Sequence, residues 1–298
     1  MDSLGNRTPG MSVTVACRQP YDFQLSRRAA DSFGGASAHQ PALKLGVRLD
    51  GVPALLEIKQ AGRDSSLMYA GARPAPSSPA SLERMAARVL NADLELEPFY
   101  AVAAGHPVLG PLTRSMRGLK AFRPSGLFEM LVIAVIEQQI SLLAAHSIRS
   151  RVVARFGAEV EGEPVFPSPE TLEAASLEQL TACGLSARKA EYVSGLAQAV
   201  VRGTFDLEAL ESAPSEEVRE RITALRGFGL WSADYVLIRG LARPDAVPVD
   251  DLGIRTIVGR LLGDGSRASA SETAALLAPF APYRGVAAFY LLVAQRLV

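Results

Sequence analysis

The spacing of apolar residues changes once along this chain, and that change limits the folds open to it. Over 12–73 apolar and polar residues alternate, as in Ala42–Leu49, which reads A-L-K-L-G-V-R-L and predicts a half-buried strand. Beyond about residue 94 this alternation stops, and apolar residues recur every three or four positions. We therefore expect an N-terminal sheet followed by helices.

The N-terminal part reads as a meander of strands with one helix. The Asp50-Gly51 step predicts a tight hairpin turn, because this dipeptide accepts the left-handed backbone that such turns need. The segment Arg73–Ser78 reads R-P-A-P-S-S and predicts a loop. Strands are expected over 12–17, 42–49, 53–60 and 63–72, and a helix over 79–91.

The remainder, residues 100–298, is expected to be all-helical. The segment 128–156 predicts a long helical region with a break near Gln139, and its apolar stretch Met130–Ile136 predicts a buried central helix. A loop is expected at 106–111, and Ser168 is expected to cap a short helix that Pro169 opens. Further helices are predicted over 177–183, 187–202, 215–225, 230–241, 251–262, 271–278 and 284–297.

The predicted fold class is mainly α, a two-lobed, all-helical body with an N-terminal α+β domain. The expected boundaries are a flexible leader over 1–11, the α+β domain over 12–99 and the helical body over 100–298. Within the body, a middle lobe of about 120–240 contains the segment 215–241, and the other lobe combines 100–119 with 241–298.

Composition excludes several classes of function. The 298 residues include 31 basic and 31 acidic side chains, so any nucleic-acid binding must depend on local patches rather than on an overall field. Cys17 and Cys183 lie far apart and the three histidines are scattered, which argues against a zinc or iron–sulfur site. No signal segment or bilayer-length apolar stretch is present, so we expect a cytoplasmic protein with no membrane partner.

The segment Ser215–Leu241 carries the clearest chemical signal. A charged amphipathic helix runs into L-R-G-F-G, and a second helix begins at once. Gly227 and Gly229 leave backbone N–H groups uncovered, and the helix N-terminus adds its dipole, a combination that suits a DNA phosphate. Ser232 would add a hydroxyl donor. A tight turn without any ligand shows the same pattern, so the glycines alone do not decide.

Two adjacent acids follow this segment. The stretch Ala246–Arg255 reads A-V-P-V-D-D-L-G-I-R and places Asp250 and Asp251 where an extended connection enters a helix. An Asp in that place is most often an N-cap. With two acids, one can cap the helix while the other faces a binding site, and the residues by themselves leave open which acid does which.

Together these segments resemble the helix-hairpin-helix DNA glycosylase superfamily, which includes endonuclease III and 8-oxoguanine DNA glycosylase. The match is closest to its 3-methyladenine DNA glycosylase II, or AlkA-like, branch and covers nearly the whole chain. Gln19–Phe23 is similar to the start of that branch's extra N-terminal domain, an α+β fold like the TATA-binding protein. The other matching motifs are L-R-G-F-G-L-W-S-A-D-Y, D-D-L-G-I-R, F-P-S-P-E-T-L, C-G-L-S-A-R-K-A-E-Y-V and A-P-Y-R-G-V-A-A-F-Y.

The resemblance implies a monofunctional DNA glycosylase of base excision repair. Such an enzyme flips out alkylated purines, for example 3-methyladenine and 7-methylguanine, and hydrolyses their N-glycosidic bond. Asp251 is the implied catalytic carboxylate, which stabilises the oxocarbenium-like sugar, and Asp250 supports it. The D-x-x-I-R context favours Asp251, whereas the spacing in the bifunctional branches favours Asp250.

The resemblance also implies how a flipped base is held. Trp231 and Tyr235, four apart on one helix, match aromatic residues of the base pocket, and core packing is the alternative for each. Phe289 and Leu292 in the last helix complete the implied pocket, although Leu292 stands where the branch has an aromatic residue. Gln139 takes the position of the wedge that fills the gap in the duplex, and an exposed polar residue at a helix break is the alternative.

The remaining expectations concern DNA contacts, cofactors and rival functions. No metal or organic cofactor is expected in the chemistry, although the superfamily can hold Na⁺ or K⁺ on backbone carbonyls equivalent to those of Thr223, Leu225 and Phe228. Trp231 replaces the lysine nucleophile of the lyase branches, which disfavours the rival oxidised-base glycosylase/lyase. A non-catalytic helix-hairpin-helix DNA-binding module is the other rival.

The resemblance implies a monomer whose partner is double-stranded DNA with damaged bases. The implied DNA-binding residues are Gln139, Gly227, Gly229, Ser232, Arg226 and Arg284.

Overall fold

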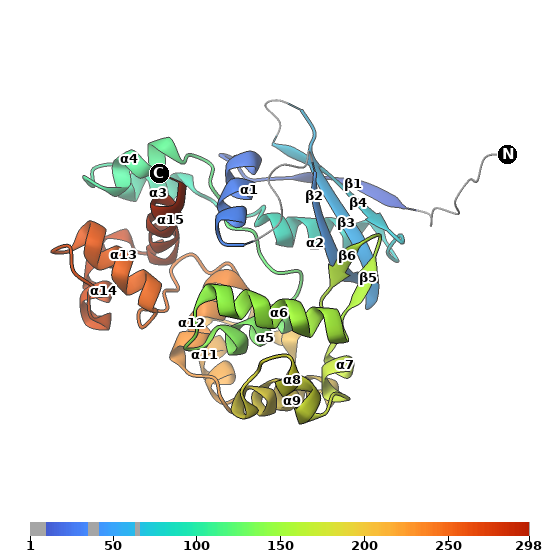
Figure 1. Ribbon diagram of the computed structural model, residues 1–298. Helices are drawn as coiled ribbons and strands as arrows, with labels where there is room; N and C mark the ends of the chain where they lie inside the picture. The colour runs from blue at the N-terminus through green and yellow to red at the C-terminus, as the bar shows by residue number, and fades with distance from the viewer. Residues whose placement is uncertain (1–9, 35–41, 63–65, 298) are drawn as a thin grey trace.

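The structure of this chain, a computed structural model, describes residues 10–34, 42–62 and 66–297. A twisted sheet lies at one end of the molecule, and helices make up most of the rest (Figure 1). The expected flexible leader over 1–11 lies largely outside the described residues, and Met11 already begins the first strand.

The N-terminal sheet follows the alternation of apolar residues. Its first four strands are β1 (Met11–Ala16), β2 (Leu43–Leu49), β3 (Val52–Gln60) and β4 (Leu67–Arg73), which confirms the predicted meander. Each neighbouring pair among β2, β3, β4 and β1 is antiparallel. Asp50 and Gly51 turn the chain between β2 and β3 with φ of 51° and 78°, as the sequence predicts for a two-residue hairpin.

The prediction of an all-helical body is wrong. Two short strands, β5 (Ala158–Val160) and β6 (Glu163–Val165), lie inside that body and extend the sheet to six strands in the order β1-β4-β3-β2-β6-β5. β6 runs parallel to β2, with Gly46 opposite Val165, so the sheet is mixed. A Cβ atom on Gly46 would lie 2.3 Å from the Pro164 carbonyl oxygen, so this glycine is what lets β6 approach.

Three helices in the first 115 residues were not predicted. The new elements are α1 (Phe23–Ser32), α3 (Glu97–Ala103) and α4 (Leu109–Ser115), and α4 overlaps the expected loop at 106–111. α1 begins where the Asp22 carboxylate accepts the Leu25 N–H, and it buries Phe23 and Leu25. α2 (Pro79–Leu90) matches its prediction and buries Leu82 and Ala86 in the core of the sheet.

The helical body has two apolar cores, one around α5 (Leu127–Glu137) and one around α15 (Arg284–Leu297). α5 is buried from Leu127 to Ile136 apart from Glu129, which confirms the predicted central helix. The helices are α5 (Leu127–Glu137), α6 (Leu142–Phe156), α7 (Pro169–Glu173), α8 (Leu177–Ala182), α9 (Ala187–Val201), α10 (Leu207–Ser212), α11 (Ser215–Thr223), α12 (Leu230–Arg239), α13 (Leu252–Leu262), α14 (Ala270–Leu277), the 3₁₀ turn η1 (Ala278–Phe280) and α15 (Arg284–Leu297).

Two apolar clusters meet at the connection between α12 and α13. Ala246 belongs to the cluster around α5, whereas Val247, the next residue, belongs to the cluster around α15. The chain therefore crosses from one core to the other just before Asp250 and Asp251. Among the described residues, no single helix is long and apolar enough to cross a membrane, and only the bent pair of α14–η1 and α15, at 106°, meets the length and composition together.

Candidate active site and DNA-contacting hairpin

The turn between α11 and α12 has the expected helix-hairpin-helix form. The Phe228 N–H donates to the Leu225 carbonyl at 3.1 Å and closes the turn. Gly227 has φ of +92°, and a Cβ atom there would lie 2.2 Å from the ring of Tyr192. Both the backbone conformation and the packing against α9 therefore require glycine at this position.

Gly229 is a glycine for another reason. Its backbone is extended, with φ of −109°, and a Cβ atom there would meet nothing within 4 Å. It is the N-cap of α12, yet no side chain caps the first N–H groups of that helix. The start of α12 is open to solvent, since Gly229 has free space beside it and the side chain of Leu230 is exposed. This is the geometry that an approaching anion needs.

Asp251 is held from two sides. It is the N-cap of α13, and its Oδ1 atom accepts the Ile254 N–H at 3.0 Å. Its Oδ2 atom accepts the indole N–H of Trp231 at 3.0 Å. One carboxylate thus caps α13 and also faces the first turn of α12. The sequence suggested that one acid would cap the helix and the other would face a binding site, whereas Asp251 combines both positions.

Asp250 is placed differently. Its side chain is exposed, and it makes no hydrogen bond or ion pair with another described residue. Because a catalytic carboxylate must keep a fixed position, the two donors on Asp251 favour that residue over Asp250.

Trp231 and Tyr235 form a stacked pair on one face of α12. Their ring centroids lie 4.9 Å apart at an interplanar angle of 18°. The Tyr235 hydroxyl donates to Glu137 and accepts from Arg239 at 2.6 Å, and burial raises the pKa of this phenol above its usual value. Tyr235 packs against the α5 cluster, whereas Trp231 belongs to none of the three apolar clusters in the described part of the chain. Tyr235 therefore supports Trp231, which is free to contact a ligand.

Phe289 and Leu292 lie on α15, the last helix of the chain. Both are half-buried on α15 and pack against the second apolar cluster. Phe289 contacts the ring of Tyr290 edge-on at 6.5 Å, and no ring contact between described residues joins it to Trp231. The structure therefore shows no ring contact between Phe289 and the Trp231–Tyr235 pair.

Gln139 lies at the predicted break between α5 and α6. It is exposed and has φ of +57°, which is uncommon for a residue with a side chain. Ile140, Leu142 and Leu143 surround it and are exposed as well, Leu143 to 82%. Sequence reasoning missed these three, although an apolar run directly after a helix break was a visible signal.

The other expected DNA-contacting residues are engaged within the protein. Ser232 is 1% exposed, and its hydroxyl accepts from Gln138, so it points away from a bound phosphate. Arg226 pairs with Glu191 at 2.8 Å, and Arg284 pairs with Asp245 through two of its nitrogens. Both ion pairs are partly exposed, and such pairs are weak enough for a DNA phosphate to compete.

The carbonyls of Thr223, Leu225 and Phe228 lie in the hairpin and its approach, and the Leu225 carbonyl accepts the Phe228 N–H. Such a set of neutral oxygens suits a hard, oxygen-seeking cation rather than a transition metal. No group of three or more His, Cys, Asp or Glu side chains that could hold a metal ion occurs among residues 10–34, 42–62 and 66–297.

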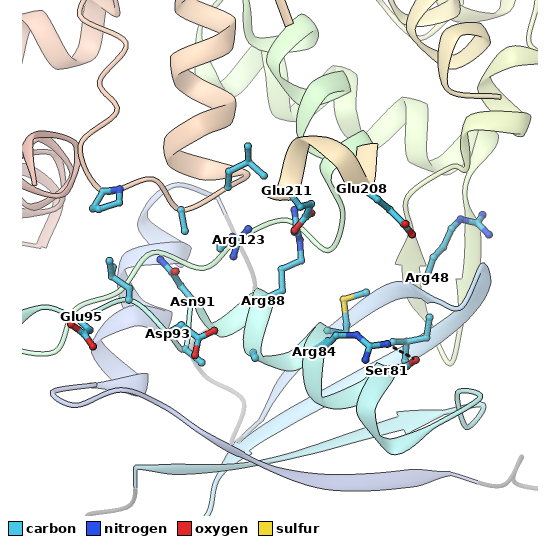
Figure 2. Close-up of a pocket in the computed structure, with 18 of the residues that line it drawn as sticks. Arg48, Ser81, Arg84, Arg88, Asn91, Asp93, Glu95, Arg123, Glu208 and Glu211 are labelled. Carbon is cyan, nitrogen blue, oxygen red and sulfur yellow. Dashed lines mark hydrogen bonds and ion pairs between the residues drawn. The ribbon is translucent and has the colours of Figure 1, made fainter. Parts of the chain in front are cut away.

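A large cleft lies away from this site. It measures about 850 Å³ and lies between α2 and the segment that follows α12. Figure 2 shows Arg88, Arg123 and Glu211 converging there, and both arginines donate to the Gly240 carbonyl. A second cavity of about 330 Å³ is lined by Leu230 and Arg284. Neither Asp251 nor Trp231 lines either space, and the larger cleft lies at the far end of α12, about 15 Å from the hairpin.

The fold and these contacts define a helix-hairpin-helix protein with a carboxylate fixed beside the hairpin. The model of the HhH-GPD superfamily, base excision DNA repair proteins, matches residues 132–282, which is half of the chain. This chain belongs to that superfamily, as the sequence resemblance implied.

Individual relatives agree with this family. A Bacillus subtilis (strain 168) protein named DNA-3-methyladenine glycosylase is 30% identical over 203 residues, 67% of each chain. The structure of an Archaeoglobus fulgidus 3-methyladenine DNA glycosylase matches with a TM-score of 0.83 at 25% identity, over 96% of this chain and 98% of that one. A Schizosaccharomyces pombe 3-methyladenine DNA glycosylase in complex with abasic DNA matches 65% of this chain and 95% of that one, with a TM-score of 0.59 at 29% identity. Alignments with further curated relatives cover from 35% to 76% of the lengths of those proteins, for example 54% of a Schizosaccharomyces pombe DNA-3-methyladenine glycosylase.

Proposed function

We propose that this protein is a monofunctional DNA glycosylase of base excision repair that removes alkylated purines from duplex DNA. The observation that carries the proposal is the Asp251 carboxylate, held by the Ile254 N–H and the Trp231 indole beside a hairpin with open N–H groups. The names of the relatives in Bacillus subtilis and Archaeoglobus fulgidus support the substrate class.

The hairpin would hold the DNA backbone. The uncapped N–H groups at the start of α12 bind a phosphate, and the extended Gly229 leaves it room. Arg226 and Arg284 exchange their exposed carboxylate partners for neighbouring phosphates. Binding of this kind is independent of sequence, as an enzyme that searches a genome for damage requires.

The target base must leave the stack, and Trp231 would receive it. An alkylated purine carries positive charge and is electron-poor, so it stacks favourably on the electron-rich face of an indole. Tyr235 supports that indole from behind. Gln139, with the exposed apolar side chains around it, fills the gap that the base leaves in the duplex.

Asp251 would then stabilise the reaction at the sugar. As the N-glycosidic bond breaks, its electron pair goes to the cationic base, which leaves neutral, while positive charge grows on the sugar. The carboxylate lowers the energy of that cation, water adds to the anomeric carbon, and its proton passes to the solvent. No lysine follows Lys189 in the sequence, and Trp231 stands just after the hairpin, where a Schiff-base lyase step needs its lysine. Lys189 itself is bound to the carbonyls of Ile136 and Gln138.

The test is base release from methylated duplex DNA by the wild type, Asp251→Asn and Asp250→Asn. Asn caps helices as well as Asp does, so Asp251→Asn should fold and should bind duplex through the hairpin. Its amide has one acceptor oxygen, so it keeps the Ile254 N–H contact and gives up the Trp231 indole contact. We expect it to lose at least about a hundredfold in base release, because it removes the charge that stabilises the sugar. Asp250→Asn should lose less than about tenfold, since that side chain has no fixed position.

The products separate the rival functions. Free methylated purine with unbroken abasic strands supports a monofunctional glycosylase, whereas strand nicking indicates a lyase. Tight duplex binding without base release from any lesion would point to a non-catalytic DNA-binding module. Equal losses in the two variants would contradict the assignment of Asp251.

A further inference from the structure

The turn that carries Gln139 is tied to the hairpin by its neighbour Gln138. The Nε2 atom of Gln138 donates to the Gly227 carbonyl at 2.9 Å and to the Ser232 hydroxyl at 3.0 Å. Gly227 belongs to the hairpin turn and Ser232 to the first turn of α12. One side chain thus joins the end of α5 to both parts of the hairpin.

A second residue holds the same turn from α9. The Lys189 ammonium group donates to the carbonyls of Ile136 and Gln138, at 2.8 and 2.6 Å. These carbonyls end α5, where the helix dipole also favours a cation. Burial lowers the pKa of Lys189, and no ion pair joins its ammonium group to a carboxylate in the described part of the chain. The Lys189 ammonium group therefore binds the backbone of this turn and holds it in place.

These contacts set the conformation of Gln139. Its φ of +57° is one that residues with side chains seldom adopt without support from their surroundings. The peptide before it is held by Lys189, and the side chain before it is held by the hairpin. Gln139 itself is exposed, so no packing of its own side chain explains the conformation.

We propose that Gln138 and Lys189 are positioning residues that make the hairpin and the Gln139 turn one rigid unit, so that capture of a DNA phosphate places the wedge. Ser232 acts in this unit through Gln138, since its buried hydroxyl cannot reach a phosphate. The proposal rests on the proposed function, because it takes the hairpin as the phosphate site and Gln139 as the wedge.

The unit has a consequence for recognition. Because the phosphate site and the wedge cannot move separately, binding one phosphate determines which step of the duplex Gln139 enters. A loose turn would still allow binding to undamaged DNA through the hairpin. It would lose the extra affinity for a duplex that contains a gap. A rigid turn presents Gln139 in its bound conformation, so less conformational entropy is lost when the wedge enters the gap.

The test compares affinity for an undamaged duplex with affinity for one containing a tetrahydrofuran abasic analogue. The fluorescence of 2-aminopurine opposite the analogue reports unstacking by the wedge. The variants are Gln138→Met, which keeps length but removes the donor, Ser232→Ala, Lys189→Met and the conservative Lys189→Arg. Gln198→Met on α9 is the matched control, because the Gln198 side chain makes no hydrogen bond with a described residue.

We expect Gln138→Met and Lys189→Met to lose the preference for the abasic duplex by about tenfold, the effect of one buried hydrogen bond network, and to lose the fluorescence rise. Affinity for undamaged duplex should stay within about twofold, and Lys189→Arg should restore part of the preference. Ser232→Ala should lose less of the preference for the abasic duplex than Gln138→Met does. Adding Gln139→Ala to Gln138→Met should reduce the preference for the abasic duplex only a little further, because the effects of mutating coupled residues do not add.

The outcomes separate this inference from the proposed function. If the wild type itself shows no preference for the abasic duplex, the wedge and base flipping fail together. If the wild type has the preference and Gln138→Met keeps it, or if the losses in the double variant add, the inference is overturned while the function stands. Should Gln138→Met melt far below the wild type, Ser232→Ala and Lys189→Arg decide in its place.

Discussion

Gly227 and Gly229 are both glycines of the hairpin, but a side chain would clash with the protein at Gly227 and would have free space at Gly229. At Gly227 a Cβ atom would clash with the Tyr192 ring, and φ is positive, so a substitution damages the fold. At Gly229 there is open space and an ordinary backbone, so a substitution damages only what approaches from outside. A substitution at Gly229 therefore tests DNA binding without lowering the stability of the fold.

We predict that Gly229→Asp folds at least as well as the wild type and loses at least about tenfold in duplex affinity. Asp is a strong N-cap and favours the positive end of the α12 dipole, but its charge repels a phosphate at the same donors. Gly227→Ala should instead lower the free energy of unfolding by about 1–3 kcal/mol, from strain and overpacking. Urea denaturation and duplex titration at fixed salt measure the two effects. Wild-type affinity in Gly229→Asp would rule out phosphate binding at α12.

At the scale of elements, the β5–β6 hairpin changes the relation between the sheet and the helical body. β6 covers the edge of β2, and an uncovered edge strand would expose unpaired N–H and C=O groups. The hairpin turn uses Glu161 and Gly162 with φ of 51° and 84°, and Glu161 pairs with Arg73 of β4 at 2.7 Å. Because α6 leads directly into β5, the sheet also fixes the far end of the helix that begins beside Gln139.

We predict that Gly46→Val releases β6 from β2. Its Cβ atom would fall 2.3 Å from the Pro164 carbonyl oxygen, which is backbone and cannot move aside cheaply. The free energy of unfolding should fall by about 2 kcal/mol or more, in the range of overpacked positions. Amide hydrogen exchange should speed up at Val165 and not in the β3–β4 pair. Unchanged protection of β6 would mean that the strand does not depend on this close approach.

At the scale of the whole molecule, Lys120 joins distant parts of the chain in a buried position. Its ammonium group donates to the carbonyls of Arg18 and Ala92, at 3.0 and 2.9 Å, and stands over the Tyr21 ring. Burial lowers the pKa of Lys120 to about 8. A cation inside the junction between the N-terminal sheet and the helical body costs free energy, even though hydrogen bonds satisfy it.

This cost predicts a pH dependence of stability. The unfolded chain keeps the Lys120 proton up to about pH 10.4, whereas the folded chain releases it near pH 8. In the window between these values the unfolded state binds more protons, so the contribution of this group to stability rises with pH, and the full cost is present below about pH 8. Wild type should gain up to about 3 kcal/mol relative to Lys120→Met across this window. Denaturant titrations at several pH values measure the difference, and parallel pH profiles of the two proteins would contradict it.

Local sequence signals predicted much of this protein. The alternating strands, the Asp50-Gly51 turn, the break at Gln139 and an acidic N-cap at either Asp250 or Asp251 depend on residues within a few positions of each other. Backbone preference, side-chain spacing and capping act over that range, so the pattern alone carries them. The helix-hairpin-helix and its family were also identified from the sequence, because ordered motifs at matching spacing are specific.

Tertiary structure decided the contacts that give those elements their roles. The Trp231–Asp251 bond spans 20 residues, the Gln138–Ser232 bond 94 and the Lys120–Arg18 bond 102. Sequence reasoning expected Ser232 to face a phosphate and an all-helical body after residue 100, whereas the structure turns Ser232 inward and adds β6 to β2. A three-residue strand is too short to show a period, and a hydroxyl carries no local sign of its partner. Which residues meet across such separations depends on how the helices and the sheet pack together.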